Sequence, residues 1–176
     1  MALIEINKNN FDLEIELRYS SKNNITGRKI FKEGKCFLHN VAAEKLNLAI
    51  KIAYDFDCKL KIFDAYRPQY VQEELWKSSP NPEFLADPKK GSPHTRGIAV
   101  DLTLTKNNLE LDMGTDFDDF TEKAFHLSKK VPIKARRNRS LLLSIMTLSG
   151  FDFYQKEWWH YQLFHPKEYP IIKKLS

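Results

Sequence analysis

The amino-acid sequence predicts an α+β fold with a mainly antiparallel sheet. Helical and strand-like segments are mixed along the chain, without the regular β-α-β alternation of a doubly wound protein. Hydrophobic residues make up 42% of the chain and aromatic residues 12%, which is enough to fill a core. No repeat, low-complexity tract or Gly/Ser linker divides the sequence. We therefore expect a single domain, residues 1–176.

Three segments are predicted to be helical. Residues 41–54 place apolar side chains at helical spacing. Residues 69–76 follow Pro68, which can open a helix because a first-turn proline loses no intrahelical hydrogen bond. The third helix is expected from about residue 138 to 148, with Gly150 as its C-terminal cap.

The strand predictions rest on alternating or continuous apolar patterns. Strands are expected at residues 59–63, 98–104, 151–154 and 158–164. Between them, residues 78–93 contain four prolines, and residues 105–121 contain a glycine and several aspartates. Both stretches are expected to be irregular loops.

Charge and cysteine content limit the classes of partner. The net charge of +5 is modest, and its densest part, residues 129–139, has no interleaved aromatic side chains. We expect a solvated helix face there, and nucleic acid ranks last as a partner.

No apolar run approaches the roughly 20 residues that span a bilayer, and the N-terminus lacks a secretory pattern, so we expect a cytoplasmic protein without a membrane partner. Cys36 and Cys58 have no metal-binding or redox spacing and are expected to be reduced thiols.

The stretch SPHTRGIAVDLTL, residues 92–104, raises a question of charge. Asp101 lies inside an otherwise apolar strand, and a carboxylate removed from water needs a partner. His94 precedes it by seven residues, and His160 lies in EWWH, three residues after Glu157. Two histidines and one carboxylate, with a fourth position open to water, make a typical catalytic zinc site. Such an ion would be the partner that Asp101 needs.

Two further residues suit a hydrolytic reaction at such a site. Glu157 is a candidate general base, because hydrolysis needs a group that accepts a proton from water. Arg67, at a strand-to-helix corner, is a candidate for holding an oxyanion, since its guanidinium stays charged. Simpler interpretations stay open at this point: His94 as a surface or capping residue, Glu157 as an exposed charge, and Arg67 as a partner of Asp64.

The same motifs resemble a known family. The first stretch matches the S-x-H-x-x-G-x-A-x-D pattern of zinc D,D-peptidases, and EWWHY matches their E-x-W-H pattern. The chain is similar to the D-alanyl-D-alanine dipeptidases, the family of the vancomycin-resistance dipeptidase. Further segments resemble that family in consistent order: RYSSKNNITGR (18–28), KIFDAYRPQ (61–69), MGTDFDDFTEKAFH (113–126) and NRSLLLSIMTLSGF (138–151).

The resemblance implies a role for each matching residue. His94, Asp101 and His160 would be the ligands of one Zn²⁺, Glu157 the general acid and base, and Arg67 the stabiliser of the transition state. Three weaker assignments follow for the substrate: Asp118 would bind its ammonium group, and Tyr19 and Ser92 would line the same pocket. The implied reaction is hydrolysis of D-alanyl-D-alanine, in cell-wall precursor remodelling or D-alanine recycling. The implied fold is one small α+β domain whose central antiparallel sheet carries the zinc.

Rival functions stay open at the level of sequence. One is a D,D-carboxypeptidase or peptidoglycan endopeptidase of the same zinc superfamily, although the N-terminus shows no export signal. Another is a zinc-binding module without catalysis, which would need neither Glu157 nor Arg67. Iron or cobalt would also suit a His₂Asp site. The oligomeric state, a homodimer included, is not fixed by the sequence.

Overall fold

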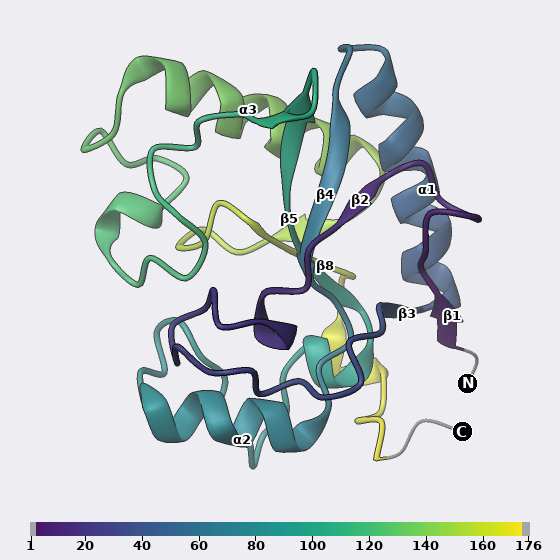
Figure 1. Ribbon diagram of the computed structural model, residues 1–176, viewed down its shortest axis with the longest axis vertical. Coiled ribbons are helices and arrows are strands. Elements are labelled where there is room, and N and C mark those ends of the chain that lie inside the picture. Colours follow the sequence, from purple (N-terminus) through teal and green to yellow (C-terminus); the bar gives the residue numbers. More distant parts are fainter. Residues whose placement is uncertain (1–2, 174–176) are drawn as a thin grey trace.

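A computed structural model describes residues 3–173, and one central sheet organises it. The strand order is β2-β4-β5-β8-β7, with β6 paired to the other end of β5 (Figure 1). Only β2 and β4 run parallel, and the remaining pairs are antiparallel. The α+β prediction is therefore confirmed. The strands are β2 (Glu14–Ile15), β4 (Lys59–Asp64), β5 (Ala99–Lys106), β6 (Leu109–Glu110), β7 (Asp152–Phe153) and β8 (His160–Gln162).

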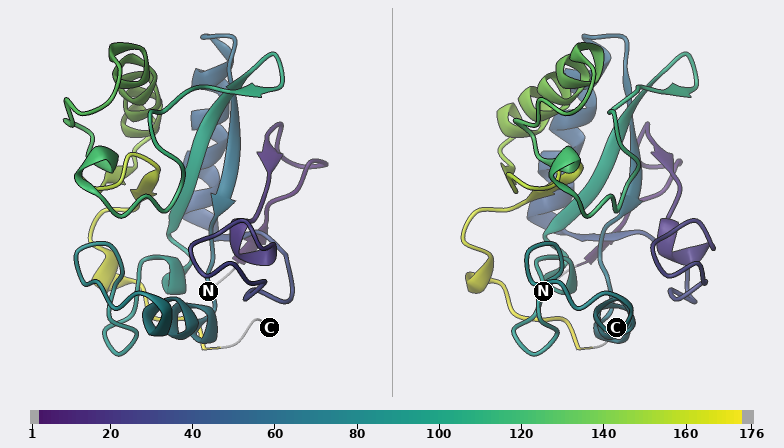
Figure 2. Two further views of the ribbon diagram at one scale, coloured as in Figure 1. Left: turned by 60° about the vertical axis from the view of Figure 1, so that its left-hand side comes forward. Right: turned by 90° about the vertical axis from the view of Figure 1, so that its left-hand side faces the viewer.

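Helices cover one face of the sheet and one of its ends. α1 (Asn40–Tyr54) and α3 (Ile133–Leu148) contact each other and lie on the same face (Figure 2). α2 (Gln69–Ser78) lies beyond the end of the long strands (Figure 1). The buried apolar residues form one cluster, which includes Leu46, Ile62 and Leu102. The remaining elements are β1 (Leu3–Glu5), which pairs with β3 (Phe37–His39), and the 3₁₀ turns η1 (Arg18–Ser20), η2 (His94–Arg96), η3 (Glu122–Ala124) and η4 (Pro166–Glu168).

The predicted helices are present, and one boundary was wrong. α1 and α2 agree with the predictions within two residues. α3 begins at Ile133, several residues earlier than expected, because Pro132 takes the N-cap position and the basic run after it continues the helix. At the other end, Gly150 follows the cap residue Ser149 with φ of +95°, the left-handed backbone that ends many helices.

The strand predictions also needed correction. The stretch 105–121 is not a loop throughout, because β5 continues to Lys106 and β6 pairs with it. Asn107 and Asn108 both have positive φ, +54° and +62°, which suits a two-residue hairpin turn. β7 and β8 are shorter than the apolar runs that predicted them, and Trp158 and Trp159 lie before β8.

Arg139 contradicts the expectation of a fully solvated basic face. Lys134 and Arg137 are exposed as expected, but Arg139 is 1% exposed. Its guanidinium donates to the carbonyls of Met113 (2.7 Å), Lys123 (2.8 Å) and Phe125 (3.0 Å). Burial lowers the pKa of Arg139 to about 10. One side chain of α3 therefore anchors both ends of the segment 113–125.

Two smaller expectations can be compared with the structure. Cys36 and Cys58 are free thiols, as predicted. Both are buried, and burial raises the pKa of both. Among residues 3–173, no helix combines the length and the apolar character that a membrane span requires.

Candidate active site

The sheet itself brings two of the predicted metal ligands together. Asp101 on β5 lies directly opposite His160 on β8 in the antiparallel register. His94 reaches the same point from η2, the turn that leads into β5. Gly97 ends this turn with φ of +69°, and a Cβ there would lie 2.9 Å from a methyl of Leu3. A glycine is therefore required for the turn that presents His94.

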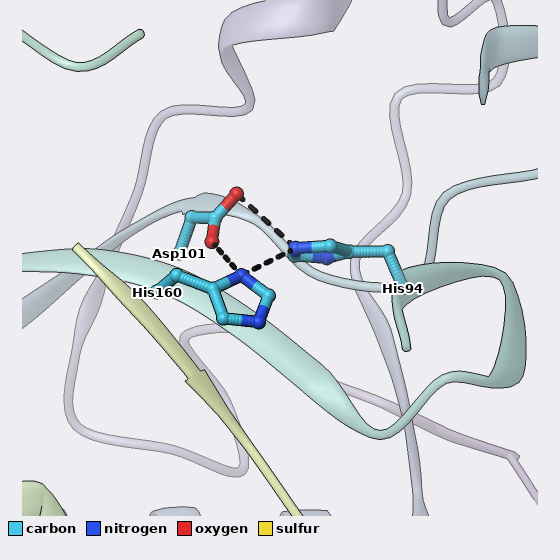
Figure 3. Close-up of side chains that lie close together, drawn as sticks. All are labelled: His94, Asp101 and His160. Carbon is cyan, nitrogen blue, oxygen red and sulfur yellow. Dashed lines mark hydrogen bonds and ion pairs between the residues drawn. The ribbon is translucent and has the colours of Figure 1, made fainter. Parts of the chain in front are cut away.

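The donor atoms of these three side chains converge (Figure 3). His94 Nε2 lies 3.2 Å from His160 Nδ1 and 3.3 Å from Asp101 Oδ2, and His160 Nδ1 lies 3.0 Å from Asp101 Oδ1. A tetrahedral metal with bonds of about 2.0–2.1 Å needs donor atoms about 3.3–3.4 Å apart. The exposed fractions are 2% for His94, 2% for Asp101 and 7% for His160. The three residues therefore fit a divalent metal ion.

Both imidazoles are oriented by a second hydrogen bond. His94 Nδ1 lies 2.8 Å from the carbonyl oxygen of Ala65, and His160 Nε2 lies 3.0 Å from Oε1 of Gln162. Both partners are oxygen acceptors, so each of these ring nitrogens carries the hydrogen. In the neutral imidazoles the lone pairs are consequently on His94 Nε2 and His160 Nδ1, the atoms that converge. Such outer partners fix the tautomer of metal-binding histidines.

Asp101 is in the form that binds a metal, whereas His160 is not. Burial raises the pKa of Asp101, but the two histidines outweigh it and hold that pKa well below its ordinary value. Burial lowers the pKa of His160, yet its hydrogen bond to Asp101 prevails and brings it to about 9. His160 therefore holds a proton at neutral pH, and a metal ion that bound to Nδ1 would have to displace it.

Glu157 lies beside the cluster without joining it. Its Oε2 is 3.8 Å from His160 Nδ1, and the residue is 6% exposed. Burial raises the pKa of Glu157 to about 8, although His160 acts in the opposite direction. A carboxyl group with a pKa near neutrality can both accept and release a proton at physiological pH.

Arg67 is held on the other side of Asp101. Its Nε and Nη2 donate to Asp64 Oδ2 at 2.8 and 2.7 Å, and Nη2 lies 3.6 Å from Asp101 Oδ2. The guanidinium carbon lies 4.9 Å from the centre of the Tyr19 ring. Burial alone lowers the pKa of Arg67, but Asp64 and the other carboxylates raise it above its ordinary value. The predicted pairing with Asp64 and the placement at the metal cluster are thus both present.

Comparison with known proteins identifies the family. A family model described as D-ala-D-ala dipeptidase matches residues 2–171. The chain belongs to this peptidase family. It is 44% identical over 162 residues to the D-alanyl-D-alanine dipeptidase of Escherichia coli K12, covering 92% of this chain and 84% of that protein. It is 31% identical over 170 residues to the D-alanyl-D-alanine dipeptidase of Enterococcus faecium, covering 84% of each chain.

One cavity of about 200 Å³ is lined by all eight site residues that the sequence predicts. Asp118, on the segment between β6 and α3, accepts hydrogen bonds from the Tyr19 hydroxyl at 3.0 and 3.1 Å. Its φ of +62° is a left-handed conformation that aspartate tolerates better than most residues. Burial raises the pKa of Asp118 to about 7. Ser92 Oγ accepts from the backbone N–H of His94 at 3.2 Å, so its hydroxyl hydrogen is free to point elsewhere.

Several residues that support this site were missed in the sequence. Gln162 was not noticed, although it lies two residues after His160 and therefore on the same face of β8. Arg139 was assigned to solvent. A wall of the cavity comes from residues 82–86, where the ring of Phe84 stacks on that of Phe120 at 5.0 Å. No sequence signal pointed to this wall, since it lies within the proline-rich stretch 78–93, which is expected to be an irregular loop.

Proposed function

We propose that this chain is a zinc-dependent dipeptidase that hydrolyses D-alanyl-D-alanine to two molecules of D-alanine. One observation carries the proposal: metal donors, a carboxyl group of raised pKa, a fixed guanidinium and a recessed carboxylate all line one cavity of about 200 Å³. The cavity is smaller than the roughly 300–1,000 Å³ of sites for drug-sized ligands. Membership of the family and the printed names of the relatives support the choice of substrate.

His94 Nε2, Asp101 and His160 Nδ1 would hold the metal. Two imidazoles and one carboxylate suit Zn²⁺ best, although iron and cobalt also accept such donors. A bound Zn²⁺ supplies Lewis acidity, which polarises a carbonyl group and lowers the pKa of a water ligand to about 7.

Glu157 is the proposed proton carrier. Its carboxylate accepts a proton from the attacking water and then delivers it to the nitrogen of the leaving D-alanine as the peptide bond breaks. The carboxyl group is not a metal donor here. Its raised pKa of about 8 makes the ionised form a stronger base than an exposed glutamate, and the positive charge of a bound metal would favour that ionised form. Burial is the main cause of that shift, so the cavity itself prepares Glu157 for this role.

Arg67 is the proposed oxyanion stabiliser. Arginine has five N–H donors, and Asp64 and Gln72 together use three of them. A free N–H of Nη2 remains on the side of Asp101. Because the guanidinium stays ionised and is already fixed, it needs no reorganisation as negative charge develops on the substrate oxygen.

Asp118 is the proposed partner of the substrate's ammonium group, with Tyr19 and Ser92 beside it. The Tyr19 hydroxyl orients the Asp118 carboxylate. The free hydroxyl hydrogen of Ser92 suits a substrate carboxylate. A longer or acylated peptide has no ammonium at this place and would leave Asp118 unpaired in a small cavity, so the site should discriminate against it.

The physiological role would be remodelling of cell-wall precursors or recycling of D-alanine. Both follow from destruction of the same dipeptide. The cytoplasmic location, the absence of a nucleic-acid or membrane partner, and the oligomeric state stay predictions.

The decisive experiment measures free D-alanine released by zinc-loaded protein. D-Ala-D-Ala, L-Ala-L-Ala and N-acetyl-D-Ala-D-Ala would be compared, with Glu157→Gln as the matched variant. We expect release from the free D,D-dipeptide alone. We also expect a rate about 10²–10⁴-fold lower in the variant, the usual contribution of a positioned acid or base. The variant should retain its zinc, because Glu157 is not among the converging donors.

Other outcomes point to the rival functions. Release from the acetylated substrate instead would assign the chain to the D,D-carboxypeptidases. Zinc binding without release from any of the three substrates would favour a zinc-binding module without catalysis.

A further inference from the structure

One contact of Arg67 leads to a residue outside the cavity. Its Nη1 donates to Oε1 of Gln72 at 2.8 Å, and Nε2 of the same glutamine donates to the carbonyl of Ala86 at 2.7 Å. Gln72 lies in the first half of α2 and has an exposed fraction of 0%. A buried amide therefore connects the guanidinium to the backbone of the segment 82–86, which forms a wall of the cavity.

The chemistry of the two partners permits only one orientation of this amide. A guanidinium has donors and no acceptor, so it must face the amide oxygen. A backbone carbonyl has only an acceptor, so it must face the amide NH₂ group. Both polar ends of Gln72 are thereby used, and a side chain with only one kind of group at this place would leave a buried partner unsatisfied.

Gln72 and Asp64 hold opposite parts of the guanidinium. Asp64 takes the hydrogens of Nε and Nη2, whereas Gln72 takes one from Nη1. Two anchors on different nitrogens fix the plane of the group, and one anchor would allow it to tilt. With the plane fixed, Nη2 stays on the side of Asp101, at 3.6 Å from its carboxylate.

We propose that Gln72 is a positioning residue that fixes the Arg67 guanidinium and joins it to the 82–86 wall of the cavity. This inference rests on the proposed function, in which Arg67 acts on the transition state. Gln72 does not line the cavity, so its effect passes through Arg67. The orientation of a catalytic group affects the chemical step more than the binding of substrate, so the effect should fall on kcat.

The kinetic test uses four variants of the zinc-loaded protein. Gln72→Met removes both polar ends at nearly constant size, and Gln72→Asn keeps the amide but shortens its reach. Gln72→Glu retains an acceptor for Arg67. Gln69→Met is the matched control, because Gln69 also lies on α2 and donates to a loop carbonyl, that of Pro88, at 2.8 Å, without contacting Arg67.

The expected result is a split between kcat and KM. Gln72→Met and Gln72→Asn should lower kcat for D-Ala-D-Ala by about 10- to 100-fold while KM changes less than about threefold. Gln72→Glu keeps the contact with Arg67 and loses only the one with Ala86, so it should retain more of the parent kcat than Gln72→Asn, and Gln69→Met should match the parent. Should Gln72→Met fail to fold, the contrast between Asn and Glu decides. Equal losses in Asn, Glu and the Gln69 control, or a change in KM alone, would overturn the proposal.

A crystal structure of zinc-loaded Gln72→Asn tests the same proposal without activity. We expect the Arg67 guanidinium to tilt or shift by about 1 Å, the scale of displacement that costs enzymes rate. A guanidinium that superimposes on the parent would refute the positioning role. If the parent itself releases no D-alanine, the proposed function fails, yet the crystal structure still decides whether Gln72 positions Arg67.

Discussion

The metal-binding half of the cavity and its substrate-facing half are built in different ways. Asp101 and His160 lie opposite each other in paired strands, and both imidazoles have a second hydrogen bond. Asp118 instead lies on an irregular segment. Tyr19 donates to its carboxylate, and Arg139 holds the segment through backbone carbonyls on either side of Asp118. The metal half thus takes its geometry from the paired strands and the turn that leads into β5, and the substrate half from a few side-chain contacts. Metal binding and substrate binding should therefore be separable by mutation.

The largest effect is expected from Asp101→Asn. The substitution keeps the size of the side chain but removes the only negative charge among the three donors. It should weaken zinc binding by more than about 100-fold, because the loss of a residue that only hydrogen-bonds a metal ligand already costs about 10- to 100-fold. The measurement is competition for zinc with a chelator of known affinity. Asp116→Asn is the control, because Asp116 is an exposed carboxylate of the segment that carries Asp118. Similar zinc affinity in Asp101→Asn and the parent would contradict the assignment of the metal donors.

A large effect on the other half is expected from Arg139→Met. The carbonyls of Met113 and Lys123 lose a charged donor, whereas that of Phe125 keeps the backbone N–H of Ser128 at 3.0 Å. Because each buried group left unpaired costs about 1–3 kcal/mol, the free energy of unfolding should fall by about 2 kcal/mol or more. The loosened segment should raise KM for the dipeptide, while zinc affinity changes less than about threefold. Chemical denaturation, dipeptide kinetics and chelator competition measure the three quantities.

Arg137→Met is the matched control for this variant. Arg137 is an exposed arginine on the same helix, and its loss should change stability by no more than about 0.5 kcal/mol. If Arg139→Met weakened zinc binding as strongly as dipeptide binding, the two halves would not be independent, and the distinction drawn here would be wrong.

A smaller effect within the metal half is expected from Gln162→Leu. The variant removes the acceptor that keeps the hydrogen on His160 Nε2, so it should weaken zinc binding by roughly 10-fold, the lower end of the range for outer partners. KM for the dipeptide should be unchanged at saturating zinc. Gln155→Leu, at an exposed position before β8, is the control. Unchanged zinc affinity in Gln162→Leu would mean that the sheet alone orients His160.

The sequence predicted these two halves unequally, and the reason is physical. His94, Asp101 and His160 belong to short motifs in which spacing along a turn or strand determines where a side chain points. Arg139 was assigned to solvent because a basic run on a helix is normally exposed, and its partners are backbone carbonyls, which leave no trace in the sequence. Gln72 is a single glutamine on a helix, and only the packing of α2 beneath Arg67 makes it buried.

The elements of the fold were predictable for the same reason. Apolar spacing located α1 and the strands β4 and β5, since it reflects local periodicity, and Pro68 marked the start of α2. The early start of α3 and the hairpin at Asn107 and Asn108 depended on a proline and on two asparagines with positive φ, which apolar spacing does not register. The register between β5 and β8, which places Asp101 opposite His160, is long-range pairing and came only with the structure.

The smallest predicted effect is a pH dependence of substrate binding through Asp118. Burial raises the pKa of this carboxyl group to about 7, so it accepts a proton as the pH falls below that value and can then no longer pair with an ammonium group. The amine of the dipeptide, with an ordinary pKa of about 7.7–8.0, stays charged in this range. Between pH 7 and pH 6 the ionised fraction of Asp118 falls about fivefold, and the affinity for D-Ala-D-Ala should fall by up to that factor. The positive charge of a bound metal would lower the pKa of Asp118. The loss of affinity would then occur at a lower pH, but affinity would still fall as the pH falls.

Glu157→Gln is the right background for this measurement, because it slows turnover and removes the other carboxyl group of raised pKa in the cavity. The dissociation constant of the dipeptide would be measured by calorimetry between pH 5.5 and 8 in roughly half-unit steps, with zinc bound throughout. Adding Asp118→Asn to that background should weaken binding and abolish the pH dependence. A pH dependence that survives Asp118→Asn would assign the titration to another group. Binding of D-Ala-D-Ala that ignores both the pH and the substitution would show that the ammonium group lies elsewhere, and the substrate-facing half would then need a different carboxylate.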